Sequence, residues 1–108
     1  MTIHKHITEN DILNIPIDAW TVLIGPEQLL FFNDVLDYLW SVTDLNLKDH
    51  IGFSKSDETK APSHISSLSI YPTNKYVLQS VVLFLFRYRK QIQEHYGIDF
   101  GAYILGGE

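Results

Sequence analysis

Five histidines are the first candidates for chemistry in this chain, because a neutral imidazole can bind a metal ion or act as a general base. They are His4, His6, His50, His64 and His95. A metal site needs ligands that converge at fixed geometry. The sequence has no cysteine, no H-E-x-x-H motif and no EF-hand pattern to accompany these histidines. We therefore predict neither a metal ion nor another cofactor.

A polar stretch in the middle of the chain holds Asp49, His50, Ser54 and His64, which could supply a nucleophile and a base. Nucleophilic catalysis needs these groups to be held rigidly, and a Ser/Lys-rich stretch without Gly-x-Ser-x-Gly offers no such frame. We predict no catalytic residue and expect that the protein is not an enzyme. The alternative is a small-molecule-binding or enzymatic role for residues 44–66, with His50 and His64 taking part.

The basic residues cluster once, in the sequence Arg87-Tyr88-Arg89-Lys90. Basic side chains interleaved with an aromatic ring can bind nucleic acid. Against this, we expect Tyr88 to point into the core, and three positive charges attract phosphate weakly in a protein of net charge −5. We therefore predict no nucleic-acid partner. Pairing with acidic side chains of residues 26–42 is another use for these bases.

The most informative pattern lies in residues 26–42, where acidic, aromatic and aliphatic side chains share the outer side of an expected helix. They are Glu27, Leu30, Phe31, Asp34, Asp37 and Tyr38. Apolar anchors inside a charged rim are typical of protein-binding surfaces. We predict that these six residues bind a partner. The alternatives are cover by another part of the chain, such as the N-terminal segment, and a homodimer through the Phe31 and Tyr38 face.

The charge of the chain indicates the kind of partner. The 108 residues include 13 acidic and 8 basic side chains, and the whole acid excess lies in residues 1–50, which hold eight acidic and two basic residues. An acidic surface attracts a basic protein and speeds the encounter, although mild acidity also keeps a protein soluble. We predict a small acidic binding module, an immunity- or antitoxin-type inhibitor that occludes a basic toxin or nuclease. A homo-oligomeric structural protein is the remaining alternative.

Length and composition predict a single globular domain over residues 1–108, since 45% of the residues are hydrophobic. The absence of cysteine fits a reducing compartment, and the N-terminal residues lack the apolar core of a signal peptide. The longest apolar run, residues 81–86, is too short to span a membrane. We expect a cytoplasmic protein that does not enter a membrane.

Two long periodic stretches must position the candidate side chains. Residues 73–96 follow Pro72 and end before Gly97, with apolar side chains at spacings of three and four, which predicts a buried central helix. A Gly-Pro pair opens the second helix, at residues 26–42. The expected core side of the second helix consists of Leu29, Phe32, Val35, Leu36, Leu39 and Trp40.

Shorter apolar runs complete the expected fold. Residues 19–24, 67–71 and 98–105 are rich in β-branched and aromatic residues or alternate in polarity, which predicts a small sheet beneath the two helices. The expected class is therefore α+β. A mostly α-helical protein is the alternative, with residues 19–24 forming a helix opened by Pro16.

Two further segments are polar. Thr8 and Asp11 have the spacing of a helix start, and Pro16 limits that helix to one or two turns. Residues 44–66 lack periodicity and predict a polar, mobile loop, in which residues 45–50 form a short turn of helix.

Overall fold

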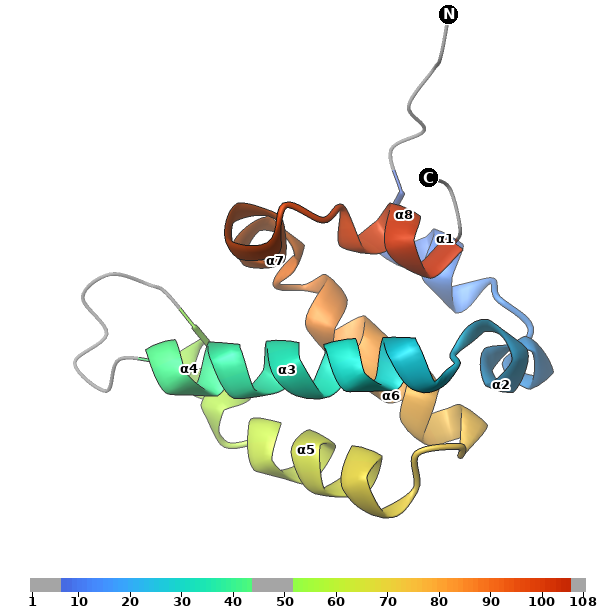
Figure 1. Ribbon diagram of the computed structural model, residues 1–108, viewed down its shortest axis with the longest axis horizontal. Helices are drawn as coiled ribbons and strands as arrows, with labels where there is room; N and C mark the ends of the chain where they lie inside the picture. Colours follow the sequence, from blue (N-terminus) through green and yellow to red (C-terminus); the bar gives the residue numbers. More distant parts are fainter. Residues whose placement is uncertain (1–6, 44–51, 106–108) are drawn as a thin grey trace, which may run out of the picture.

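The computed structural model describes residues 7–43 and 52–105, which form helices packed around a hydrophobic core (Figure 1). In chain order they are α1 (Glu9–Leu13), the 3₁₀ helix η1 (Ile17–Ala19), α2 (Trp20–Leu23), α3 (Pro26–Val42), α4 (Lys55–Glu58), α5 (Ala61–Ile70), α6 (Lys75–Phe86), α7 (Arg89–Tyr96) and α8 (Phe100–Leu105). No described residue belongs to a β-strand. The α+β prediction is therefore wrong, and the mostly helical alternative is correct.

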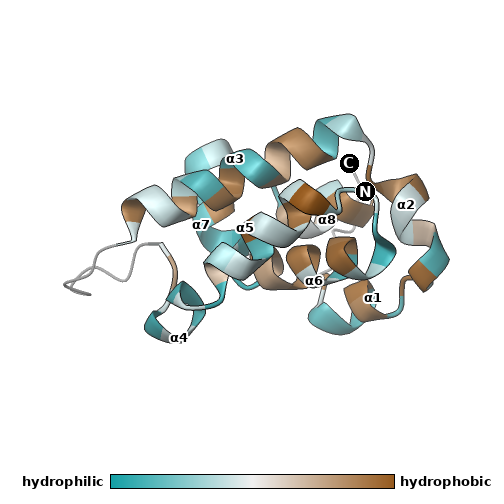
Figure 2. Ribbon diagram, turned by 90° about the horizontal axis from the view of Figure 1, so that it is seen from below, coloured by the Kyte–Doolittle hydropathy of each residue, from teal (hydrophilic) through white to brown (hydrophobic). Residues whose placement is uncertain are grey.

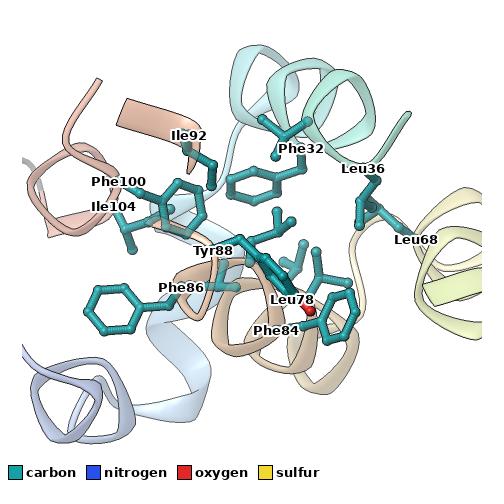
Figure 3. Packing of buried hydrophobic residues seen from close by; sticks show 14 of the residues in the cluster. Phe32, Leu36, Leu68, Leu78, Phe84, Phe86, Tyr88, Ile92, Phe100 and Ile104 are labelled. Carbon is teal, nitrogen blue, oxygen red and sulfur yellow. The ribbon is translucent and has the colours of Figure 1, made fainter. Parts of the chain in front are cut away.

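Helix α6 is the centre of the bundle and contacts α1, η1, α2 and α5. Half of its residues are buried, namely Leu78, Val81, Val82, Phe84, Leu85 and Phe86. Figure 3 shows buried side chains of α6 near Phe32 of α3 and Phe100 of α8. In Figure 2 much of α6 is hydrophobic, whereas α4 is largely hydrophilic. The prediction of a buried central helix in this stretch is confirmed.

The predicted single helix over residues 73–96 is nevertheless interrupted. Helix α6 ends at Phe86 and α7 begins at Arg89, and Tyr88 between them has φ −106° and ψ 19°. The hydroxyl of Tyr88 donates to the buried carboxylate of Asp57, at 2.6 Å. The interruption contains neither proline nor glycine, so the sequence carries no local signal for it.

The predicted strand at residues 19–24 is wrong. Trp20 is fully buried, and its carbonyl accepts a helical hydrogen bond from the backbone amide of Ile24, at 3.0 Å. Pro16 precedes η1, as the helical alternative expected. A short apolar run can form a buried turn of helix as well as a strand. In residues 19–24 the burial of Trp20 in the core selects the helix.

The predicted strand at residues 67–71 is also wrong, because α5 continues through Ile70. Leu68 is buried while Ile70 is 63% exposed. Residues that are two positions apart lie on one face of a strand but on different sides of a helix. The different exposure of Leu68 and Ile70 therefore fits the helix.

The closing strand predicted at residues 98–105 is replaced by α8. Asp99 precedes this helix and caps it, because its carboxylate accepts a hydrogen bond from the backbone amide of Ala102, at 3.3 Å. Phe100 and Ile104, four residues apart, are buried on one side. Gly101 is buried within this helix.

Part of the loop predicted within residues 44–66 is helical. Ser54 begins α4, and its hydroxyl accepts from the amide of Asp57. Helix α5 follows from Ala61. The turn of helix predicted at residues 45–50 lies outside the described residues.

The two predicted helix starts nearer the N-terminus are confirmed. The amide of Thr8 donates to Asp11 Oδ2 at 2.8 Å, the reciprocal pair of a capping box. Helix α3 has the predicted bounds, and four of its six expected core residues are buried, although Trp40 is 45% exposed. Across the described ranges, no helix combines the length and apolar character needed to cross a membrane.

Candidate protein-binding face

All six predicted partner-binding residues lie at successive turns of α3, beside α7 and α8 (Figure 1). With the aromatic residues that they meet, they form what we term the acidic aromatic face. It consists of Glu27, Leu30, Phe31, Asp34, Asp37 and Tyr38 of α3, His95 and Tyr96 of α7, and Tyr103 of α8. The three carboxylates are exposed and Leu30 is 71% exposed, whereas Phe31 and Tyr38 are partly buried.

The rings of this face form a continuous set of contacts. Phe31 packs edge-on against Tyr96, with ring centroids 5.2 Å apart, and lies 4.9 Å from the ring of Tyr103. Tyr38 stacks on His95 at 3.7 Å and also meets Tyr96 at 5.9 Å. The partial cover of Phe31 and Tyr38 thus comes from α7 and α8.

Tyr96 ties α7 to the acidic side of α3. Its hydroxyl donates to Asp34 Oδ2 at 2.7 Å. Burial raises the pKa of Tyr96, and the hydrogen bond to Asp34 and the charges of Asp34 and Asp37 raise it further. Burial and the charge of Glu27 likewise raise the pKa of Tyr103. All three carboxylates therefore act on the rings of the face, which confers a negative potential on it.

The carboxylates of this face are available to another molecule. Among the described residues, the side chains of Glu27 and Asp37 have no ion-pair or hydrogen-bond partner, and Asp34 is bound by Tyr96 alone. Elsewhere Lys75 pairs with Asp18, at 2.6 Å. Within the described part of the chain, Glu27 and Asp37 therefore have no such contact to break before they pair with a basic partner.

A small hollow of about 170 Å³ adjoins the face between α3 and α7. It is lined by Tyr38, Gln91, Glu94 and His95. The carboxylate of Glu94 can accept from a guanidinium group. This arrangement suits one arginine side chain of a partner.

The hydrogen bond between Tyr96 and Asp34 gives a testable titration. We expect Asp34→Asn to lower the pKa of Tyr96 toward its ordinary value of 10.0, but not to reach it, because burial is the largest cause of the rise. A raised pKa means that the stabilisation linked to the protonated hydroxyl is complete below about pH 10 and is lost as the pH rises further. The variant should lose less stability over that alkaline range.

Tyrosinate absorbance, compared with a Tyr96→Phe variant to assign the transition, measures this titration. Glu9→Gln on α1 is the control and should leave it unchanged. An unaltered Tyr96 titration in Asp34→Asn would show that the hydrogen bond does not hold the proton in solution.

Sequence reasoning did not assign the partners of the face on α7 and α8. Tyr96 falls at the end of the single helix predicted over residues 73–96, and Tyr103 in the strand predicted at residues 98–105. The spacing of Tyr96 and Tyr103 carries no signal that both meet Phe31, because that proximity depends on how α7 and α8 fold back onto α3.

The other candidates for chemistry are dispersed. Ser54 caps α4, and His64 stacks on Phe84 with ring centroids 4.3 Å apart. Candidates that lie outside the described residues are His4, His6, Asp49 and His50. Within the described part of the chain, no three His, Asp or Glu side chains are grouped so that they could hold a metal ion.

The basic cluster is used inside the protein. Arg87 donates to Asp57 at 2.9 Å, not to an acid of α3. The guanidinium of Arg89 lies over the ring of Phe86, 4.5 Å from its centroid. Tyr88 is buried, as predicted. Lys90, the third base of the cluster, is exposed and makes no ion pair or ring contact with the other described residues.

No protein-family model, curated protein or solved structure matches this chain. The function is therefore argued from the geometry and charge of the acidic aromatic face.

Proposed function

We propose that this protein is a small acidic binding module whose acidic aromatic face docks on a basic protein and occludes it, as immunity proteins and antitoxins do. The observation that supports this proposal is the set of three exposed carboxylates, without an intramolecular cation among the described residues, around a continuous group of aromatic rings. We place the protein in the cytoplasm.

The apolar members of the face would supply binding energy. Leu30 is exposed by 71% and is the side chain with the most surface to bury. Phe31 and Tyr38 are held in place by ring contacts with α7 and α8, so they would lose little conformational freedom on binding. Rigid aromatic anchors of this kind are common at interface hot spots.

The acidic members would supply attraction and orientation. Glu27, Asp34 and Asp37 follow one another along the 17 residues of α3, a distance of roughly 25 Å for the whole helix. A row of negative charge accelerates encounter with a basic surface and disfavours acidic competitors. The hollow beside Tyr38 and Glu94 would take an arginine of that surface.

The proposal is tested by capturing partners from the native host lysate at low and at high salt, with identification by mass spectrometry. We expect a basic protein that is retained at low salt and lost at high salt. With that protein purified, the double substitution Asp34→Lys/Asp37→Lys should weaken binding by roughly ten- to a hundredfold, mainly through a slower association rate.

The matched control is Glu9→Lys/Glu58→Lys, which changes the net charge equally but on α1 and α4. It should bind almost as well as the wild type. Equal binding by both double variants would contradict the proposed face. A mass that rises with concentration in light scattering, and that falls on Phe31→Ser, would instead favour a homodimer through this face.

A further inference from the structure

A second hollow lies between α5 and α6, on helices that do not contribute to the acidic aromatic face. Its volume is about 290 Å³. It is lined by Ser63, His64 and Ser67 of α5 and by Tyr76, Val77, Ser80 and Val81 of α6. A volume of this size is near the lower end of the range for ligand pockets, so only a small molecule would fit.

The serine and histidine side chains around this hollow make no hydrogen bonds with the other described residues. Considering the residues that the structure describes, the side-chain oxygen atoms of Ser63, Ser67 and Ser80 make no hydrogen bond, and neither does the imidazole of His64. Each hydroxyl can donate and accept, and so can a neutral imidazole. Contact with Phe84 fixes the plane of the His64 ring.

No ionised carboxylate, lysine or arginine lines the hollow. Burial lowers the pKa of His64, and nearby Lys60 lowers it further, while Asp57 opposes them. A charged ligand would therefore lose water without gaining an opposite charge, which disfavours it.

Apolar surface completes the lining. Val77 and Val81 lie on α6, and Tyr76 is 61% exposed, with the ammonium group of Lys75 over its ring, 5.7 Å from the centroid. A flat ring compound could pack its C–H groups against these side chains while its hydroxyl groups met the serines and His64.

We propose that the hollow between α5 and α6 binds a small uncharged ring compound bearing several hydroxyl groups, of monosaccharide or cyclitol size. Hydroxyl groups of the ligand would exchange hydrogen bonds with Ser63, Ser67, Ser80 and His64. The apolar face of its ring would pack on Tyr76. This site is independent of the proposed partner-binding face.

Nuclear magnetic resonance titration of the full chain tests this proposal. The probes are the methyl pyranosides of glucose, galactose and mannose, together with myo-inositol. We expect at least one to give saturable shifts of the His64 and Tyr76 ring signals and of amides in α5 and α6. Ser67→Val should raise the dissociation constant of that probe by roughly three- to tenfold, because one hydrogen bond is lost.

Ser69→Val is the matched control, since Ser69 is an exposed residue of α5 outside the hollow. It should leave the affinity unchanged, and circular dichroism checks that both variants are folded. Glucuronate, a charged analogue, should bind more weakly than the neutral sugars. The proposal is overturned if no probe gives saturable shifts at millimolar concentration, or if Ser67→Val and Ser69→Val act alike.

Discussion

Replacing Asp57 by alanine is expected to lower the free energy of unfolding by about 3–5 kcal/mol. The carboxylate is 1% exposed. Its Oδ2 atom accepts from the Tyr88 hydroxyl at 2.6 Å, and its Oδ1 atom accepts from Arg87 at 2.9 Å. The substitution removes two charge-assisted hydrogen bonds and leaves the Tyr88 hydroxyl without its shortest contact. A loss of this size is a large part of the stability of a small domain.

The same cluster joins α4 to the junction between α6 and α7. The Tyr88 hydroxyl also accepts from the backbone amide of Ser54, at 2.9 Å. Loss of Asp57 should therefore loosen α4 and the junction together. Because Asp57 and Tyr88 act on one network, the destabilisation caused by Asp57→Ala with Tyr88→Phe should be smaller than the sum of the two single effects.

Urea denaturation measures these differences. Asp57→Asn keeps an acceptor for Tyr88 and should destabilise less than alanine does. Asp37→Ala is the surface control, because Asp37 is exposed and has no partner among the described residues, and its effect should stay within about 0.5 kcal/mol. An Asp57→Ala effect as small as that of the control would show that the buried network does not stabilise the fold.

Replacing Gly52 by alanine is expected to cost about 2–5 kcal/mol, the sum of a left-handed backbone penalty and a steric clash. Gly52 has φ +87°, and an added Cβ atom would lie 2.6 Å from the Cα atom of Thr43 and 2.7 Å from its nitrogen. Backbone atoms cannot rotate away as a flexible side chain can. The clash could be relieved only if the backbone at Gly52 moved away from Thr43 at the end of α3.

Other contacts hold Gly52 close to its neighbours. Its amide donates to Gln91 Oε1 at 2.7 Å, and its carbonyl accepts from Gln91 Nε2 at 3.1 Å. The next amide, of Phe53, donates to Thr43 Oγ1 at 2.9 Å. A displacement of Gly52 would therefore disturb hydrogen bonds to both α7 and the end of α3.

Gly97 provides a matched control for the steric part of this effect. It has φ +71°, yet an added Cβ atom would have nothing within 4 Å. Gly97→Ala should cost about 1–2 kcal/mol, the backbone penalty alone. Thermal or urea unfolding of the two variants compares the costs. Equal destabilisation would mean that the close approach of Gly52 to Thr43 has no energetic consequence.

The sequence by itself determined the features that depend on neighbouring residues. The helix start at Thr8 and Asp11, the bounds of α3 and the helix end before Gly97 were all predicted correctly. In each, the signal and the structure that it specifies lie within a few residues. The sequence also predicted that the acidic and aromatic residues of α3 share one side of the helix, since helical periodicity places residues 27, 30, 31, 34, 37 and 38 there.

The tertiary structure alone decided the state of the short apolar runs at residues 19–24, 67–71 and 98–105. Such runs can be buried as a strand or as a turn of helix, and the contacts of Trp20, Leu68 and Phe100 with the core select the helix. Tertiary contacts also placed Tyr96 and Tyr103 against Phe31, and the three serines around one hollow. Those proximities arise from packing between distant segments, for which a single sequence carries no local signal.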